Sequence, residues 1–112
     1  MRTPETLAAN LWSLAKDRQL RAALLKLQQR LGPGRFVLSD RRCEHAAAVV
    51  LCKPDQPEVV AYLYCFGQDE GRFALHLEYP QFSDGPPAAA SIHEDLILDR
   101  VEDLLRVHLD IA

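Results

Sequence analysis

The hydrophobic pattern of this chain changes its period at Gly32-Pro33-Gly34, and that change constrains the fold more than any other feature. Before these residues, apolar side chains recur with a helical period. After them, short apolar runs alternate with polar turns, which is the pattern of β-strands. Because glycine and proline end helices, the sequence predicts an N-terminal helical segment followed by a sheet.

The N-terminal segment has a recognisable helix start and two apolar stripes. Thr3-Pro4-Glu5 places a capping residue, a proline and an acid in the order that helix starts favour. One stripe comprises Leu7, Leu11, Leu14, Ala15, Ala22 and Leu25, and a second, nearly opposite stripe comprises Leu20, Leu24, Leu27 and Leu31. Two arrangements explain both stripes: a break near Lys16-Asp17, or one long helix covered on two sides. We expect the second stripe to be a surface for a partner, since exposed apolar stripes mark contact sites.

Four strand candidates follow, at residues 35–39, 46–52, 59–66 and 72–79. Every connection between them is short, which favours an antiparallel meander. The second and third candidates are apolar on both faces. The sequence therefore indicates that neither face at the centre of the sheet is fully exposed to water.

The C-terminal part predicts a second helix. Residues 80–91 are rich in proline, alanine and glycine and indicate a flexible crossing, after which Ser91-x-x-Glu94 matches a capping box. We expect the last helix to run from there to about residue 110, with a core stripe of Ile97, Val101, Leu104, Leu105 and His108. The predicted fold is a two-layer α+β single domain over residues 1–112, with a four-stranded antiparallel meander and the element order α-β-β-β-β-α.

The hairpin of residues 59–79 can pair in two registers, and a shift of one residue exchanges its two faces. In one register, the residue numbers of each opposed pair add up to an even number. Ala61, Leu63 and Cys65 then lie on the same face of the sheet as Phe73, Leu75, Leu77 and Tyr79. Tyr62, Tyr64 and Phe66 then share the other face with Arg72, Ala74, His76 and Glu78. We favour this register, which predicts a protein-binding surface at Tyr62, Tyr64 and His76. The alternative register makes the aromatic residues part of the core.

Charge is divided unevenly along the chain. Residues 1–42 carry nine lysines and arginines against three acids, whereas residues 43–112 carry four against thirteen. A basic half can bind an anionic partner, or it can attract the acidic half within the fold or across a dimer. We favour the second explanation and expect no nucleic-acid partner, because no aromatic or glycine-rich nucleic-acid motif accompanies the basic half.

One polar turn offers an alternative function. Arg41, Arg42 and His45 lie within the turn "DRRCEH" and could hold a phosphate or a carboxylate. A solvated turn explains the same composition, since turns favour polar residues. We keep a small-molecule or anion-binding domain as the alternative to a protein-interaction domain.

Metal and catalytic chemistry have weak signals. Cys43-x-His45 supplies one short-spaced ligand pair, with Cys52, Cys65, His76 and His93 as candidate completions, whereas structural zinc sites have two such pairs. A Cys65–His76 nucleophile pair is conceivable on one hairpin, but the sequence shows no orienting residue for it. A phosphate-binding glycine loop and other catalytic motifs are also missing. We therefore expect no metal, no cofactor and no enzymatic activity.

The sequence thus predicts a small non-catalytic protein-interaction domain that forms a homodimer. At the level of fold alone, its outer helices and central sheet resemble small acidic secretion chaperones, which implies an adaptor role but identifies no site residue. The N-terminus has no long apolar segment of a signal peptide, and no run reaches the length of a membrane span. We expect a cytoplasmic protein without a membrane contact.

Overall fold

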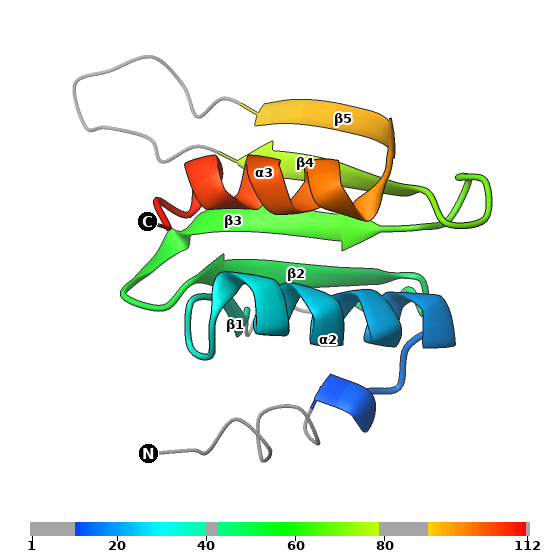
Figure 1. Ribbon diagram of the computed structural model, residues 1–112, viewed down its shortest axis with the longest axis horizontal. Coiled ribbons are helices and arrows are strands. Elements are labelled where there is room, and N and C mark those ends of the chain that lie inside the picture. Colours follow the sequence, from blue (N-terminus) through cyan, green and yellow to red (C-terminus); the bar gives the residue numbers. More distant parts are fainter. Residues whose placement is uncertain (1–10, 40–42, 79–89, 112) are drawn as a thin grey trace.

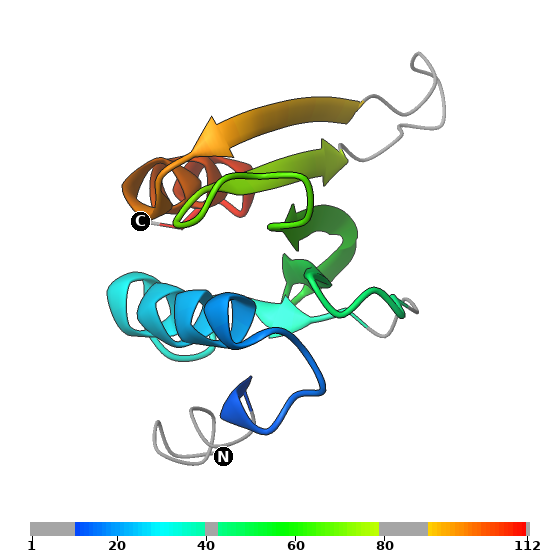
Figure 2. The ribbon, with the colours of Figure 1, turned by 90° about the vertical axis from the view of Figure 1, so that its right-hand side faces the viewer.

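A computed structural model of the chain describes residues 11–39, 43–78 and 90–111. It contains one antiparallel sheet in the order β1-β2-β3-β4-β5 and the helices α2 and α3 (Figure 1). The elements are α2 Arg18–Leu31, β1 Val37–Leu38, β2 Ala48–Lys53, β3 Gln56–Tyr64, β4 Phe73–Glu78, β5 Ala90–Leu96 and α3 Leu98–His108. Both helices lie on the same side of the sheet (Figure 2). The α+β class and the antiparallel meander are confirmed.

The N-terminal helical segment is broken where the sequence allowed a break. Residues 11–12 are helical, the chain then turns, and α2 begins after Asp17, which holds the N-cap position without a side-chain capping bond. The Lys16 ammonium stabilises the turn by donating to the carbonyls of Cys43 and His45, at 2.8 and 2.9 Å. The predicted start at residues 3–5 lies outside the described residues.

The break determines where the second leucine stripe points. Its four leucines all lie in the main core, where the helices pack on the sheet: Leu20, Leu24, Leu27 and Leu31. The structure corrects the expectation that they form a surface for a partner, because the sheet of the same chain already covers them. From the first stripe, Leu14 and Leu25 are partly buried against that core.

A fifth strand replaces the predicted start of the last helix. β5 pairs with β4, so Ser91 and Glu94 belong to a strand, and the expected capping box was wrong. Pairing with β5 gives β4 hydrogen-bond partners along its outer side, which a helix at these residues could not provide. The pairing is irregular near Asp95, which has a φ of 55° and whose N–H donates to the side chain of Gln68, and the strand ends at Leu96. Helix α3 begins two residues after β5.

The register of the β3–β4 hairpin is the one that the sequence favoured. Ala61 lies opposite Leu77 and Leu63 opposite Leu75, so the paired numbers sum to an even number. These four side chains belong to the main core beneath α2 and α3. The side chain of Tyr62 therefore projects from the opposite face.

The two oppositely charged halves of the chain meet between the helices. Arg30 of α2 donates to the carboxylate of Asp99 at 2.7 Å and lies 3.5 Å from that of Glu102, both on α3. Arg106 of α3 in turn donates to the main-chain carbonyl of Arg30 at 2.9 Å. Because exposed ion pairs contribute at most about 1 kcal/mol, these contacts align the helices more than they stabilise the fold.

Candidate interaction surface on the sheet face opposite the helices

The face of the sheet opposite α2 and α3 carries a group of aromatic side chains. We call it the aromatic face; it comprises His45, Tyr62, Tyr64, Phe66 and His76. The three side chains from β3 and β4 are half-buried, whereas those of Phe66 and His45 are exposed. Within the described residues, the helices lie on the other side of the sheet (Figure 2). The structure thus brings the predicted residues Tyr62, Tyr64 and His76 onto one face.

Ring contacts organise the aromatic face into two groups. Phe66 stacks on Tyr64 and on His45, with 4.5 Å between ring centroids in each contact. Tyr62 meets the ring of His76 edge-on, with a centroid distance of 5.3 Å. Since stacked rings limit one another's rotation, the surface is held in shape before any partner arrives.

A small apolar floor lies beside the rings. Val50, Cys52 and Val60 are almost fully buried on this face, and Tyr62 packs against them. They form a second core cluster, separate from the one beneath the helices. The burial of these residues agrees with the expectation that the central strands are not fully exposed on either face, and Cys43 and Tyr62 pack against them.

Strand pairing aligns four residues across the sheet in what we call the cross-strand row. Val50 lies opposite Tyr62, Tyr62 opposite His76, and His76 opposite Ile92. Directly opposed residues share a face, so the row crosses from β2 to the edge strand β5. Ile92, which the sequence did not single out, is 59% exposed at the end of the row.

Negative charge lies close to the aromatic face. Burial raises the pKa of the Tyr64 phenol above its ordinary value, and the carboxylate of Glu94 raises it further. A raised pKa means that the neutral phenol is favoured, so Tyr64 remains a hydrogen-bond donor at neutral pH. Ile92 of β5 lies opposite His76, and Glu94 follows two residues later in the same strand, which places this acid on the side of the rings.

The predicted anion site is only partly described. Arg41 and Arg42 lie outside the described residues, so their arrangement relative to His45 stays a prediction. His45 Nδ1 accepts a hydrogen bond from the N–H of Ala47 at 3.0 Å, and its ring stacks on Phe66. The described contacts of His45 therefore join it to the aromatic face.

The proposed cysteine–histidine pair is not brought together. Cys65 packs against the core beneath the helices, whereas His76 projects from the opposite face of the sheet. Burial, and then the negative charge of Asp17, raise the pKa of the Cys65 thiol. A raised pKa disfavours the nucleophilic thiolate. Over the part of the chain that the structure describes, no three histidine, cysteine or acidic side chains are grouped as a metal site would require.

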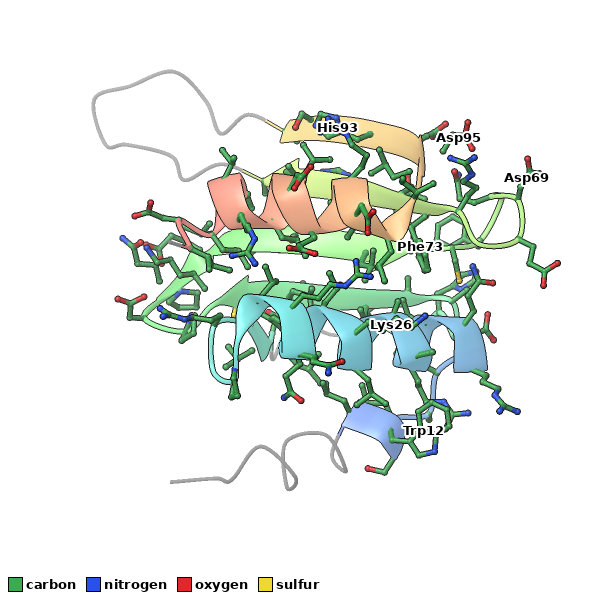
Figure 3. The ribbon with its side chains drawn as sticks, in the orientation of Figure 1. Trp12, Lys26, Asp69, Phe73, His93 and Asp95 are labelled. Atoms are coloured by element: carbon green, nitrogen blue, oxygen red, sulfur yellow. The ribbon has the colours of Figure 1, made fainter. Side chains whose placement is uncertain are left out.

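A cavity of about 490 Å³ lies on the helix side of the sheet. Its lining combines the C-terminal half of α3 with residues of the sheet: Lys53, Gln56, Val59, Leu77, His93, Leu104, Val107, His108 and Asp110. The Nε2 of His108 donates to the carbonyl of Val60 at 2.8 Å, so this histidine is anchored to β3. Figure 3 shows His93 on β5. The sequence carried no signal for this cavity, because its walls come from segments far apart in the chain.

Comparisons with known proteins identify no relative: no family model matches the chain, and neither the curated proteins nor the solved structures contain a match. No helix within the described ranges has the length and apolar character needed to cross a membrane.

Proposed function

We propose that this chain is a non-catalytic protein-interaction domain and that the aromatic face is its contact surface. The observation that carries this proposal is a sheet face with stacked, partly exposed rings, whereas α2 and α3 both pack on the opposite side. Aromatic residues are enriched in the cores of protein interfaces. Tyrosine supplies a large contact area and a hydrogen-bond donor at a low cost in conformational entropy.

The chemistry of the face favours a partner with apolar and basic side chains. Tyr64 and Phe66 supply apolar surface for burial, and Glu94 supplies a negative charge beside it. A lysine or arginine of the partner can bind this carboxylate and also lie over a ring, where a cation–π contact contributes about 0.5–1 kcal/mol at an exposed site. Opposite charges across an interface also accelerate association.

The proposal is tested by comparing what matched variants capture. The immobilised chain is incubated with an extract of its source cells, and each bound protein is quantified by mass spectrometry. The test variant is Tyr64→Ser with Phe66→Ser, and the control is Val107→Ser, which removes an 83% exposed side chain on α3. We expect a partner that the wild type and the control retain equally and that the test variant retains about tenfold less.

Identical sets of bound proteins for all three chains would contradict the proposal. Circular dichroism of each variant excludes unfolding as the cause of a loss. Because Phe66 and Tyr64 are partly exposed, the double substitution removes ring contacts without opening the main core.

A second candidate function, small-molecule binding, is favoured by the cavity beside α3. Its volume lies in the usual range of small-molecule sites, about 300–1,000 Å³. Lys53 lines this cavity, and its ammonium lies 3.9 Å from the carboxylate of Asp110, a long distance for an ion pair. Thermal unfolding is measured with phosphorylated metabolites, nucleotides and small carboxylic acids, for the wild type and for Lys53→Met. Stabilisation of the wild type alone supports this function, and no stabilisation by any compound contradicts it.

A further inference from the structure

We propose that a second copy of this chain pairs with the open edge of β5, antiparallel to it, with the two-fold axis passing through Ile92. The inference rests on the proposed function and deepens it, because it names a partner and joins two aromatic faces into one surface. The pairing continues the sheet of one copy directly into the sheet of the other.

The first argument is the position of β5 at the edge of the sheet. β5 pairs with β4 on one side, and among the described strands none lies on its outer side (Figure 1). Alternate main-chain N–H and C=O groups of an edge strand point outward and can pair with another strand. The opposite edge is β1, which has only the two residues Val37–Leu38 and offers a much shorter template.

The second argument is the side chains along this edge. Ile92 is the most exposed of the large apolar side chains in the sheet, at 59%. β5 runs from Ala90 to Leu96, but the φ of 55° at Asp95 and a shift in the pairing with β4 interrupt its regular extended backbone after Glu94. Figure 3 shows Asp95 at the end of β5 that leads into α3, where the N–H of Asp95 bonds to the side chain of Gln68. Among the described residues, the regularly extended segment is therefore Ala90 to Glu94.

The third argument is the register, which symmetry restricts. In a two-fold antiparallel pair, opposed residues lie on the same face, so the axis must pass through a residue. An axis at Ile92 pairs the whole regularly extended segment that the structure describes: Ile92 opposes itself, Ser91 opposes His93, and Ala90 opposes Glu94. No carboxylate then faces another carboxylate, and the exposed isoleucines bury each other.

Neighbouring registers pair fewer residues or bring less compatible side chains opposite each other. Among the described residues, an axis at Ser91 would use only residues 90–92. An axis at His93 would place Glu94 against the apolar Ile92 and would need Asp95, which is not extended, to pair with Ser91. The geometry therefore selects the axis at Ile92.

The fourth argument is continuity with the cross-strand row. Val50, Tyr62, His76 and Ile92 already lie side by side from β2 to β5. With the axis at Ile92, the same four residues of the second copy follow in reverse order. Two aromatic faces then form one surface, which has twice the contact area for the partner considered above.

The first experiment measures mass in solution. Sedimentation equilibrium at two well-separated concentrations compares the wild type with Ile92→Lys, which would place two like charges at the axis. The control is Val107→Lys, which adds the same charge to an exposed position on α3. We expect a dimer for the wild type and the control, and a dissociation constant raised by about tenfold or more for Ile92→Lys.

The second experiment tests the register with single cysteines under mild oxidation, and cross-linked sites are mapped by mass spectrometry. Ile92→Cys should form a disulfide with itself, because directly opposed Cα atoms are about 4.5–5.5 Å apart, within disulfide reach. Ser91→Cys should not cross-link with itself but should cross-link with His93→Cys when the two chains are mixed. The unsubstituted chain, which has three free cysteines of its own, is oxidised in parallel and shows which cross-links do not depend on the introduced cysteine.

Each outcome bears on one claim. The β5 pairing is overturned if the wild type is a monomer at both concentrations. It is also overturned if the wild type is a dimer that Ile92→Lys does not dissociate and that Ile92→Cys does not cross-link. Neither result affects the aromatic face as a contact surface, which depends on capture by the Tyr64 and Phe66 variants. A different outcome would contradict the proposed function and support the pairing. In it, the wild type and the Tyr64→Ser/Phe66→Ser variant capture the same proteins, and Ile92→Cys still cross-links.

Discussion

The ring of Tyr62 meets the ring of His76 edge-on, at a centroid distance of 5.3 Å, because the two residues lie directly opposite each other in β3 and β4. The contact follows from the even-sum register of this hairpin. The same register that places leucines beneath the helices therefore places these rings on the opposite face.

This pair should be energetically coupled. We expect the double-mutant cycle of Tyr62→Ala and His76→Ala to give a coupling free energy of about 0.5–1 kcal/mol, the usual range for cross-strand and aromatic pairs. The measurement is urea unfolding of the wild type, both single variants and the double variant. The cycle of Tyr64→Ala with His76→Ala serves as the control. Equal coupling in the two cycles would argue against a specific ring contact.

The leucine stripe of α2 should behave as core. Leu24 is fully buried, so we expect Leu24→Ala to lower the free energy of unfolding by about 3 kcal/mol. Leu25 is only partly buried, and Leu25→Ala should cost about 1 kcal/mol. Urea unfolding at a concentration where the chain is monomeric distinguishes the two. If Leu24→Ala leaves the monomer as stable as the wild type, the stripe is not covered by its own sheet.

The turn between β3 and β4 should depend on glycine at position 71. Gly71 has a φ of 76°, and no atom lies within 4 Å of where a Cβ would stand. The cost of Gly71→Ala is therefore one of backbone conformation, about 1–2 kcal/mol of unfolding free energy. Gly71→Asn should cost less, since asparagine adopts this conformation more readily. Glu70→Ala in the same turn is the control, and a comparable loss there would point to another cause.

Cys65 should make the fold less stable in alkaline solution. Its pKa is raised above the ordinary value of 9.0 in the folded chain, mainly by burial. The folded chain thus holds the thiol proton more tightly than the unfolded chain does. The resulting stability is complete below the pKa of the unfolded chain and is lost as pH rises through the folded pKa. Tyr64, whose pKa is also raised, adds a loss of the same sign at higher pH.

Urea unfolding between about pH 8 and pH 10 measures this dependence. We expect a smaller loss of stability with pH for Cys65→Ala than for the wild type. Cys43→Ala is the matched control. Alkylation of Cys65 in the folded chain should also be slow, because little thiolate is present. Rapid alkylation at neutral pH would contradict the raised pKa.

Much of the architecture follows from local patterns. The breaker at residues 32–34 separates helix from sheet, and short turns between strands specify an antiparallel meander. The strict alternation of β4 identifies its core face. These features depend on residues close together in the chain, so a single sequence was sufficient to predict them. The hairpin register did not follow in the same way: the sequence favoured the even-sum register and left the other open, and the structure has the even-sum register.

The β5 segment shows where local patterns mislead. Ser91 and Glu94 have the spacing of a capping box, but their backbone pairs with β4. A capping box satisfies a few main-chain groups at the start of a helix, whereas pairing satisfies groups along a whole strand and completes the sheet. The choice depended on β4, whose need for a partner is not visible within residues 90–96.

The sequence by itself determined which residues of one segment share a face: helical and alternating periods placed four leucines of α2 together, and Tyr62 with Tyr64. That His76 joins these tyrosines was decided by the hairpin register, which the structure settles. Only the tertiary structure decided what covers each face. It placed the leucines against the sheet and left the aromatic face opposite the helices. Periodicity is a property of one segment, whereas burial requires a second segment, whose position depends on contacts between residues far apart in the chain.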